Sequence, residues 1–137
     1  MNFSSDADFM AQFEFCLLPG REWTHRAHIR VAWCYLSRLG FDAGLDEIRR
    51  RIQAFNAAHH TPETVTRGYN ETITTAYARL VWAAMDDDKS SEEFCERHPE
   101  LMTHAILNRH YSSERIFNLE AKARFVEPDL LALPERR

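Results

Sequence analysis

The stretch THRAHIRVAWCYLSRLG, residues 24–40, decides the fold of this chain. Its apolar side chains recur at intervals of three and four residues, which is the spacing of one face of an α-helix. It opens on a threonine, a frequent N-cap, and closes on a glycine, a frequent helix end. The stretch therefore predicts a helix over about 24–39 whose buried face runs through Ala32, Tyr35 and Leu39.

Helical periodicity extends outward from this segment in both directions. Three more long helices are expected near residues 6–17, 43–59 and 69–85, with shorter ones near 99–109 and 119–125. The acidic and serine residues after the last long helix favour a capped loop, and the proline-punctuated C-terminal tail should lie extended over the body. We expect an all-α fold: an up-down bundle of about four main helices with a short helical and extended C-terminal appendage.

The composition narrows the class of protein. The 137 residues suit a single domain over 1–137, and with 45% apolar and 28% charged residues the chain should bury a real core. No apolar run reaches the roughly 20 residues of a membrane helix, and no export signal opens the chain, so we expect a cytoplasmic protein without a membrane partner. The net charge of -4 disfavours nucleic acid as a partner, and three scattered cysteines disfavour disulfides.

The buried faces of three predicted helices turn polar where the helices should meet. The face of the second helix continues toward its N-terminus through His28 to His25, so both imidazoles are expected to point inward. The face of the fourth helix continues to Asn70, beside Glu71, and that of the third ends at His59. Short connections make consecutive helices antiparallel, which places these ends together. The sequence therefore predicts one polar pocket at one end of the bundle.

A metal or small-molecule site is the leading hypothesis for this pocket. His25 and His28, three residues apart on one face, suit two ligands of one metal ion, and Glu71 would complete a set that suits Zn(II) or non-haem Fe(II). Glu71 is alternatively expected to be a catalytic general base beside a metal-bound water. The other side chains expected to contact a ligand are Trp23, His59, Tyr69, Asn70, Thr75 and His110.

Structural explanations stay open for the same residues. Trp23 is placed to pack on His28 as a hydrophobic staple at the start of the second helix. Asn70 could equally cap the fourth helix, and His59 could favour the C-terminus of the third electrostatically. The domain would then be a non-catalytic interaction module whose polar cluster only fixes the packing. A third possibility is a DNA-binding helix-turn-helix with its turn at residues 39–41, which the net negative charge of the chain disfavours.

Two segments carry a resemblance to a known family. WTHRAHIRVAWCYL (23–36) and GYNETIT (68–74) resemble the W-T-H-x-A-H and G-Y-H-E-T-I-T motifs of a family of small bacterial proteins of unknown function. Further likeness lies at 111–116 and 125–130. The resemblance implies an α-helical protein with a metal or ligand pocket, and it supplies no activity. The positions that it carries over are His25, His28, Tyr69, Glu71, Thr72 and Thr74.

One position departs from the second motif of that family, in which a histidine precedes the glutamate. Asn70 stands there, and its carbonyl oxygen is a weaker ligand for Zn or Fe than an imidazole. We therefore expect a pocket for a small molecule, or for a divalent metal ion held more weakly because of Asn70. A small metal-dependent enzyme and an interaction module remain the two functional alternatives.

Overall fold

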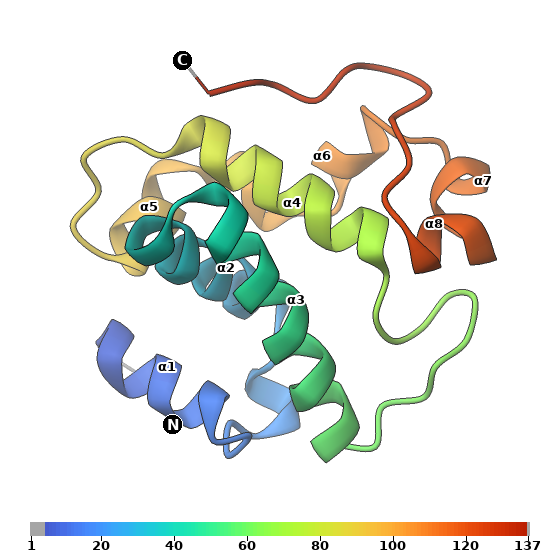
Figure 1. Ribbon diagram of the computed structural model, residues 1–137. Coiled ribbons are helices and arrows are strands. Elements are labelled where there is room, and N and C mark those ends of the chain that lie inside the picture. Colours follow the sequence, from blue (N-terminus) through green and yellow to red (C-terminus); the bar gives the residue numbers. More distant parts are fainter. Residues whose placement is uncertain (1–4, 137) are drawn as a thin grey trace.

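A computed structural model describes residues 5–136, and within that range every regular element is helical. The expected all-α class is confirmed. The long helices are α1 (Asp6–Glu14), α2 (His25–Leu39), α3 (Phe41–Ala58) and α4 (Glu71–Ala84) (Figure 1). The short elements are η1 (Gly20–Glu22), α5 (Ser91–Arg97), η2 (Pro99–Met102), α6 (Ala105–Asn108), α7 (Ser113–Ile116) and α8 (Leu119–Ala123).

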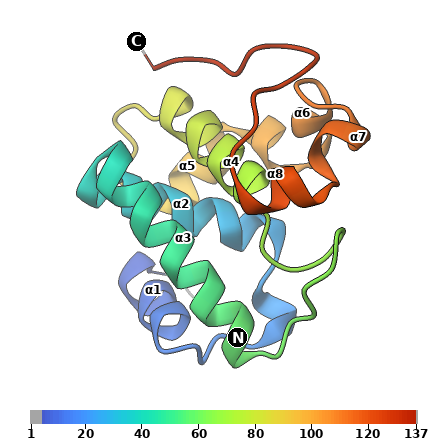
Figure 2. The same ribbon diagram turned by 45° about the vertical axis from the view of Figure 1, so that its right-hand side comes forward.

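Helix α2 occupies the middle of the molecule, where α3, α4 and α5 all pack against it (Figure 2). Gly40 alone separates α2 from α3, and its φ of 82° is a left-handed conformation that glycine adopts without strain. Gly44 then lets α3 approach closely, because a Cβ at this position would lie 3.0 Å from the carbonyl oxygen of Tyr35. The two glycines thus hold the start of α3 tightly against the end of α2.

Aromatic side chains from several elements share one core. They come from α1, α2, α3, α5 and the segment after α6, so these elements are packed on one another rather than merely adjacent in the chain. The fully buried aromatic residues are Phe9, Phe13, Tyr35, Phe55, Phe94 and Tyr111. Burial of each contributes roughly 1.5–3 kcal/mol of hydrophobic free energy to the folded state.

Helix α1 ends earlier than its pattern predicts. The sequence favoured a helix to about residue 17, but α1 stops at Glu14, and Cys16 adopts a φ of 58°. A non-glycine residue in this left-handed region cannot continue a right-handed helix. The chain therefore leaves the helix before it reaches the Pro19-Gly20 pair that the sequence favoured as the stop.

Helix α5 lies where the sequence predicted only a capped loop. The Nε of Arg30 donates to Ser91 Oγ at 2.8 Å, and the backbone N–H of Ser91 donates to the carboxylate of Asp6 at 2.8 Å. Ser90 caps the helix by accepting from the N–H of Glu93. Partners from α1 and α2 thus stabilise α5, and no local pattern could reveal them.

The expected single helix over 99–109 is two short turns. Thr103 lies between η2 and α6 with an extended backbone, φ −127° and ψ 153°, which no helix can contain. Helix α8 likewise stops at Ala123, two residues before the expected end, because Arg124 is extended. The break at Thr103 matters for the site, because the turn that it creates carries His104.

The C-terminal tail lies extended over the body of the molecule, as its prolines predicted. The hydroxyl of Tyr111 donates to the carbonyl of Val126 at 2.7 Å, and Nδ1 of His110 donates to the carbonyl of Leu131 at 2.9 Å. The guanidinium of Arg136 donates to carbonyls in the last turn of α4. None of the helices described here combines the length and the apolar character needed to cross a membrane.

Candidate functional site

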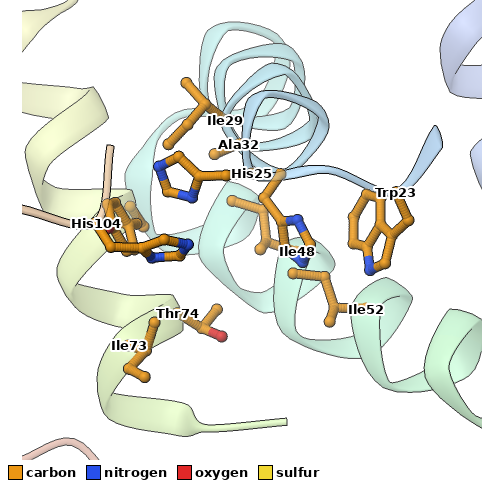
Figure 3. A pocket seen from close by; sticks show the side chains of 12 residues that line it. Trp23, His25, Ile29, Ala32, Ile48, Ile52, Ile73, Thr74 and His104 are labelled. Carbon is orange, nitrogen blue, oxygen red and sulfur yellow. The ribbon is translucent and has the colours of Figure 1, made fainter. Parts of the chain in front are cut away.

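The first turns of α2 border a cavity of about 330 Å³ that α3 and α4 close from the other sides. Figure 3 shows the side chains that line it, with His25 and His104 near one another and Trp23 on the far side. Helix α3 contributes Ile48 and Ile52, and α4 contributes Ile73. The cavity is therefore apolar over most of its wall, with imidazoles along one side.

The start of α2 is built as its sequence predicted. Thr24 is the N-cap, and its Oγ1 accepts from the N–H of Ala27 at 3.2 Å. The indole of Trp23 packs on the ring of His28 with the ring centroids 3.7 Å apart, and on Phe55 of α3 at 4.8 Å. The hydrophobic staple is therefore present, and it holds the imidazole of His28 in one orientation beside the cavity.

His25 and His28 each use one ring nitrogen to bind a backbone carbonyl. Nε2 of His25 lies 2.8 Å from the oxygen of Leu101, and Nδ1 of His28 lies 2.8 Å from the oxygen of Thr24. A carbonyl oxygen only accepts, so both nitrogens must carry the proton. The second nitrogen is left without a partner among the described residues: Nδ1 in His25 and Nε2 in His28.

Burial keeps both rings in their neutral forms. Loss of solvent, with smaller contributions from the nearby His25 and His104, lowers the pKa of His28 to about 4. Burial is also the main cause that lowers the pKa of His25. At neutral pH each ring therefore has one N–H and one bare nitrogen, which can accept a hydrogen bond.

His104 is a wall residue that the sequence did not reveal. It lies in the turn between η2 and α6, its ring centroid is 4.4 Å from that of His25, and it is exposed to solvent. It is thus the solvent-exposed member of the three imidazoles that line the cavity. The sequence placed position 104 inside a single helix and offered no periodic signal that its side chain would join the two histidines of α2.

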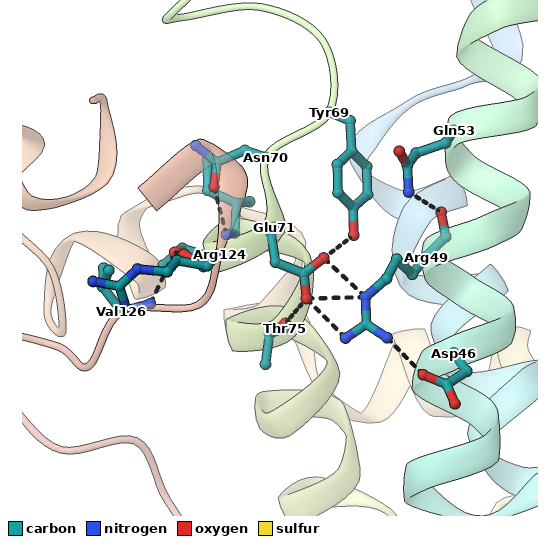
Figure 4. Close-up of polar contacts among 11 residues, drawn as sticks. Asp46, Arg49, Gln53, Tyr69, Asn70, Glu71, Thr75, Arg124 and Val126 are labelled. Carbon is teal, nitrogen blue, oxygen red and sulfur yellow. Dashed lines mark hydrogen bonds and ion pairs between the residues drawn. The ribbon is translucent and has the colours of Figure 1, made fainter. Parts of the chain in front are cut away.

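Glu71 does not join the histidines, so the predicted His25, His28 and Glu71 triad is wrong. Its carboxylate accepts from Arg49 Nη2 at 2.7 Å and from the Nε of the same guanidinium, as Figure 4 shows. The hydroxyl of Tyr69 donates to it at 2.6 Å. Glu71 and Ile73 lie on different sides of the first turn of α4, so Ile73 lines the cavity while this carboxylate faces Arg49 on α3.

Glu71 is also badly suited to be the general base that the sequence suggested. Hydrogen bonds from Arg49, Tyr69 and Thr75, with the charge of the guanidinium, overcome its burial and lower its pKa. A carboxylate whose oxygens are occupied by a guanidinium and two hydroxyls has little capacity to take a proton. Tyr69 and Thr75, which were expected to contact a ligand, serve this ion pair instead.

The remaining predicted residues lie outside the cavity. Asn70 is the N-cap of α4, with Oδ1 accepting from the N–H of Ile73 at 2.9 Å, and its amide donates to Ile116. His59 stacks on Phe55 and lies exposed at the end of α3. His110 fastens the C-terminal tail. Of the predicted set, the cavity brings together Trp23, His25 and His28.

The geometry gives no support to the expected metal centre. Within residues 5–136, no three His, Cys, Asp or Glu side chains lie close enough together to hold a metal ion. Glu71, which was expected to be the third ligand beside His25 and His28, forms an ion pair with Arg49 instead. The expectation that Asn70 weakens a metal site is therefore not supported either, because the side chain of Asn70 caps α4 outside the cavity.

Comparison of the chain with protein-family models, with curated proteins and with solved structures finds no match. The resemblance of residues 23–36 and 68–74 to a bacterial family therefore stays a prediction.

Proposed function

We propose that this domain binds a small, mainly apolar organic molecule in the cavity between α2, α3 and α4. The observation that carries the proposal is the cavity itself: about 330 Å³, with an isoleucine-rich wall and a few polar groups at one side. Binding sites for small molecules are concave and mostly apolar, with a small number of polar groups that fix orientation. The groove beneath the C-terminal tail differs from it, because charged side chains such as Arg79 and Glu127 line that groove beside the apolar ones.

The size of the cavity limits the ligand. A cavity of about 150 Å³ lined by aliphatic and aromatic side chains holds one benzene molecule. A cavity of about 330 Å³ has room for roughly twice that volume. A compound with two fused rings, or an aliphatic chain of similar bulk, would fill the space between Trp23 and Ile73.

The chemistry of the wall favours binding over catalysis. With a pKa of about 4, His28 is a weak base at neutral pH and gives little driving force for proton abstraction. The three cysteines are not candidates for a nucleophile here, because none lines the cavity and burial raises the pKa of Cys34 and Cys95. The polar groups are better suited to orient a ligand than to transform one.

A pocket-filling substitution tests the proposal. Ala32 lines the cavity from α2 and is buried, so Ala32→Met would place a flexible apolar side chain in the space that the ligand needs. Naphthalene, measured by calorimetry with protein titrated into the probe, should bind wild type with a Kd of about 0.1 mM or tighter and Ala32→Met at least tenfold more weakly.

The matched control is Ala43→Met, the same change at an exposed position of α3. This variant should bind naphthalene as wild type does. Absence of binding to wild type, or equal Kd values for the two methionine variants, would refute the proposed site.

A further inference from the structure

We infer that the ligand of this cavity is an uncharged alcohol or phenol, whose hydroxyl donates a hydrogen bond to a bare ring nitrogen of His25 or His28. The inference rests on the proposed function, because it specifies the chemistry of a molecule that the cavity must first accommodate. It depends on three observations about the wall: two fixed tautomers, an unpaired tyrosine hydroxyl and the lack of charge.

The two tautomers present acceptors where a histidine commonly presents a donor. The backbone carbonyls of Thr24 and Leu101 hold the N–H of His28 on Nδ1 and that of His25 on Nε2. Both residues line the cavity, and neither Nε2 of His28 nor Nδ1 of His25 has a partner among residues 5–136. A ligand group that donates can satisfy such a nitrogen, whereas an ether or a carbonyl cannot.

Tyr77 lines the same cavity through its ring. The ring lies edge-on to His25 with the centroids 4.9 Å apart, and the residue is 8% exposed. Its hydroxyl is buried and has no hydrogen-bond partner within the described part of the chain. A buried unsatisfied hydroxyl costs free energy, which a ligand oxygen would recover once rotation of the side chain brings this group to the cavity. A ligand hydroxyl both donates and accepts, so it can bind an imidazole and this phenol together.

The wall disfavours charged ligands, because imidazoles and the phenol of Tyr77 are its only ionisable side chains among the described residues. No Lys, Arg, Asp or Glu of the described chain lines the cavity, and both imidazoles of α2 are neutral. A carboxylate or an ammonium group entering the cavity would lose its hydration without meeting an opposite charge, which is strongly unfavourable. The wall therefore favours an uncharged hydroxyl compound over an acid or an amine.

Four naphthalene derivatives test the inference by calorimetry on the full chain. 2-Naphthol has the hydroxyl, 2-methylnaphthalene replaces it by a methyl group, 2-methoxynaphthalene can accept but not donate, and 2-naphthoate is an anion. We expect 2-naphthol to bind more tightly than the methoxy compound by about tenfold, and 2-naphthoate to bind at least a hundredfold more weakly than 2-naphthol.

Two polar variants locate the acceptor. In His25→Gln the side-chain amide can still donate to Leu101, and in His28→Asn it can still donate to Thr24, but each exchanges the bare nitrogen of a rigid ring for an amide oxygen on a more flexible side chain. The affinity ratio of 2-naphthol to 2-methylnaphthalene should fall about tenfold in at least one of them. Effects of altered packing act on both probes and largely cancel in this ratio, and circular dichroism confirms that each variant is folded.

The possible outcomes distinguish a failure of the hydroxyl inference from a failure of the proposed binding function. Failure of wild type to bind any of the uncharged probes overturns the proposed function. Binding of 2-methylnaphthalene with no preference for 2-naphthol over the methoxy compound, or a ratio unchanged in both variants, overturns the hydroxyl inference and leaves the apolar cavity standing.

Discussion

At the scale of single residues, the chemistry of the site depends on two imidazoles whose inward placement the sequence predicted. His25 and His28 continue the apolar face of α2, and a position on that face must point inward whatever its side chain. The sequence could not show which ring nitrogen carries the proton. That property comes from the carbonyls of Thr24 and Leu101, and the second of these lies 76 residues further along the chain than His25.

The low pKa of His28 predicts that stability falls in mild acid. Its pKa is about 4 in the folded protein against the ordinary histidine value of 6.5, so between these pH values the unfolded chain binds more protons. Free energy of unfolding should therefore decrease by about 3 kcal/mol as pH drops from 6.5 to 4, measured by urea denaturation. The lowered pKa of His25 acts in the same direction.

His28→Asn isolates the contribution of this residue. The groups beside the ring that can titrate are His25 on α2, His104 before α6 and Tyr77 on α4, whereas α3 presents isoleucines. Asparagine does not titrate, so the variant should lose most of the pH dependence between 6.5 and 4. A slope equal to that of wild type would show that the ring is not held neutral by the fold.

At the scale of elements, local signals predicted the long helices and α8, but they missed α5 and joined η2 and α6 into one helix. The caps at Thr24 and Asn70 and the turn at Gly40 depend on single residues, and α2, α3 and α4 begin and end close to where the sequence placed them. Helix α5 depends instead on side chains of α1 and α2 that meet Ser91. The local cap at Ser90 marks where this helix begins, but its seven residues show no apolar periodicity long enough to predict it.

Asn70 should be a structural residue with two separable roles. Asn70→Ala removes the cap of α4 and the hydrogen bond from its amide to the carbonyl of Ile116, so it should cost about 2 kcal/mol of unfolding free energy. Asn70→Ser keeps a capping oxygen and loses the amide that reaches Ile116, so it should cost about half as much. Urea denaturation of the two variants checks the order; a cost below about 0.5 kcal/mol for alanine would contradict it.

At the scale of the whole molecule, the sequence predicted a polar site where three helices meet, and the structure divides that site in two. The first turns of α2 and α4 both line the cavity, while Glu71, on another side of α4, forms an ion pair with Arg49. The periodicity of α4 placed Asn70 on its buried face and Glu71 about 100° round from it, but it could not show that the partner of Glu71 is Arg49 of α3.

The division predicts that Glu71→Gln affects stability without affecting binding. The substitution removes the charge that balances Arg49 in a carboxylate whose side chain is 13% exposed, so it should cost roughly 1–3 kcal/mol of unfolding free energy. The Kd for naphthalene should stay within twofold of wild type at a temperature where both proteins are folded. A binding loss of tenfold or more would place Glu71 in the ligand site after all.

The position of a bound probe tests the proposed binding site most directly. Isotope-filtered nuclear Overhauser spectra of the labelled protein with unlabelled naphthalene report contacts between the probe and individual methyl groups. Binding in the cavity predicts cross-peaks to the methyl groups of Ile48, Ile52 and Ile73, which line it. Cross-peaks only to residues outside it, such as Leu133 in the groove beneath the C-terminal tail, would contradict the claim that this cavity is the binding site.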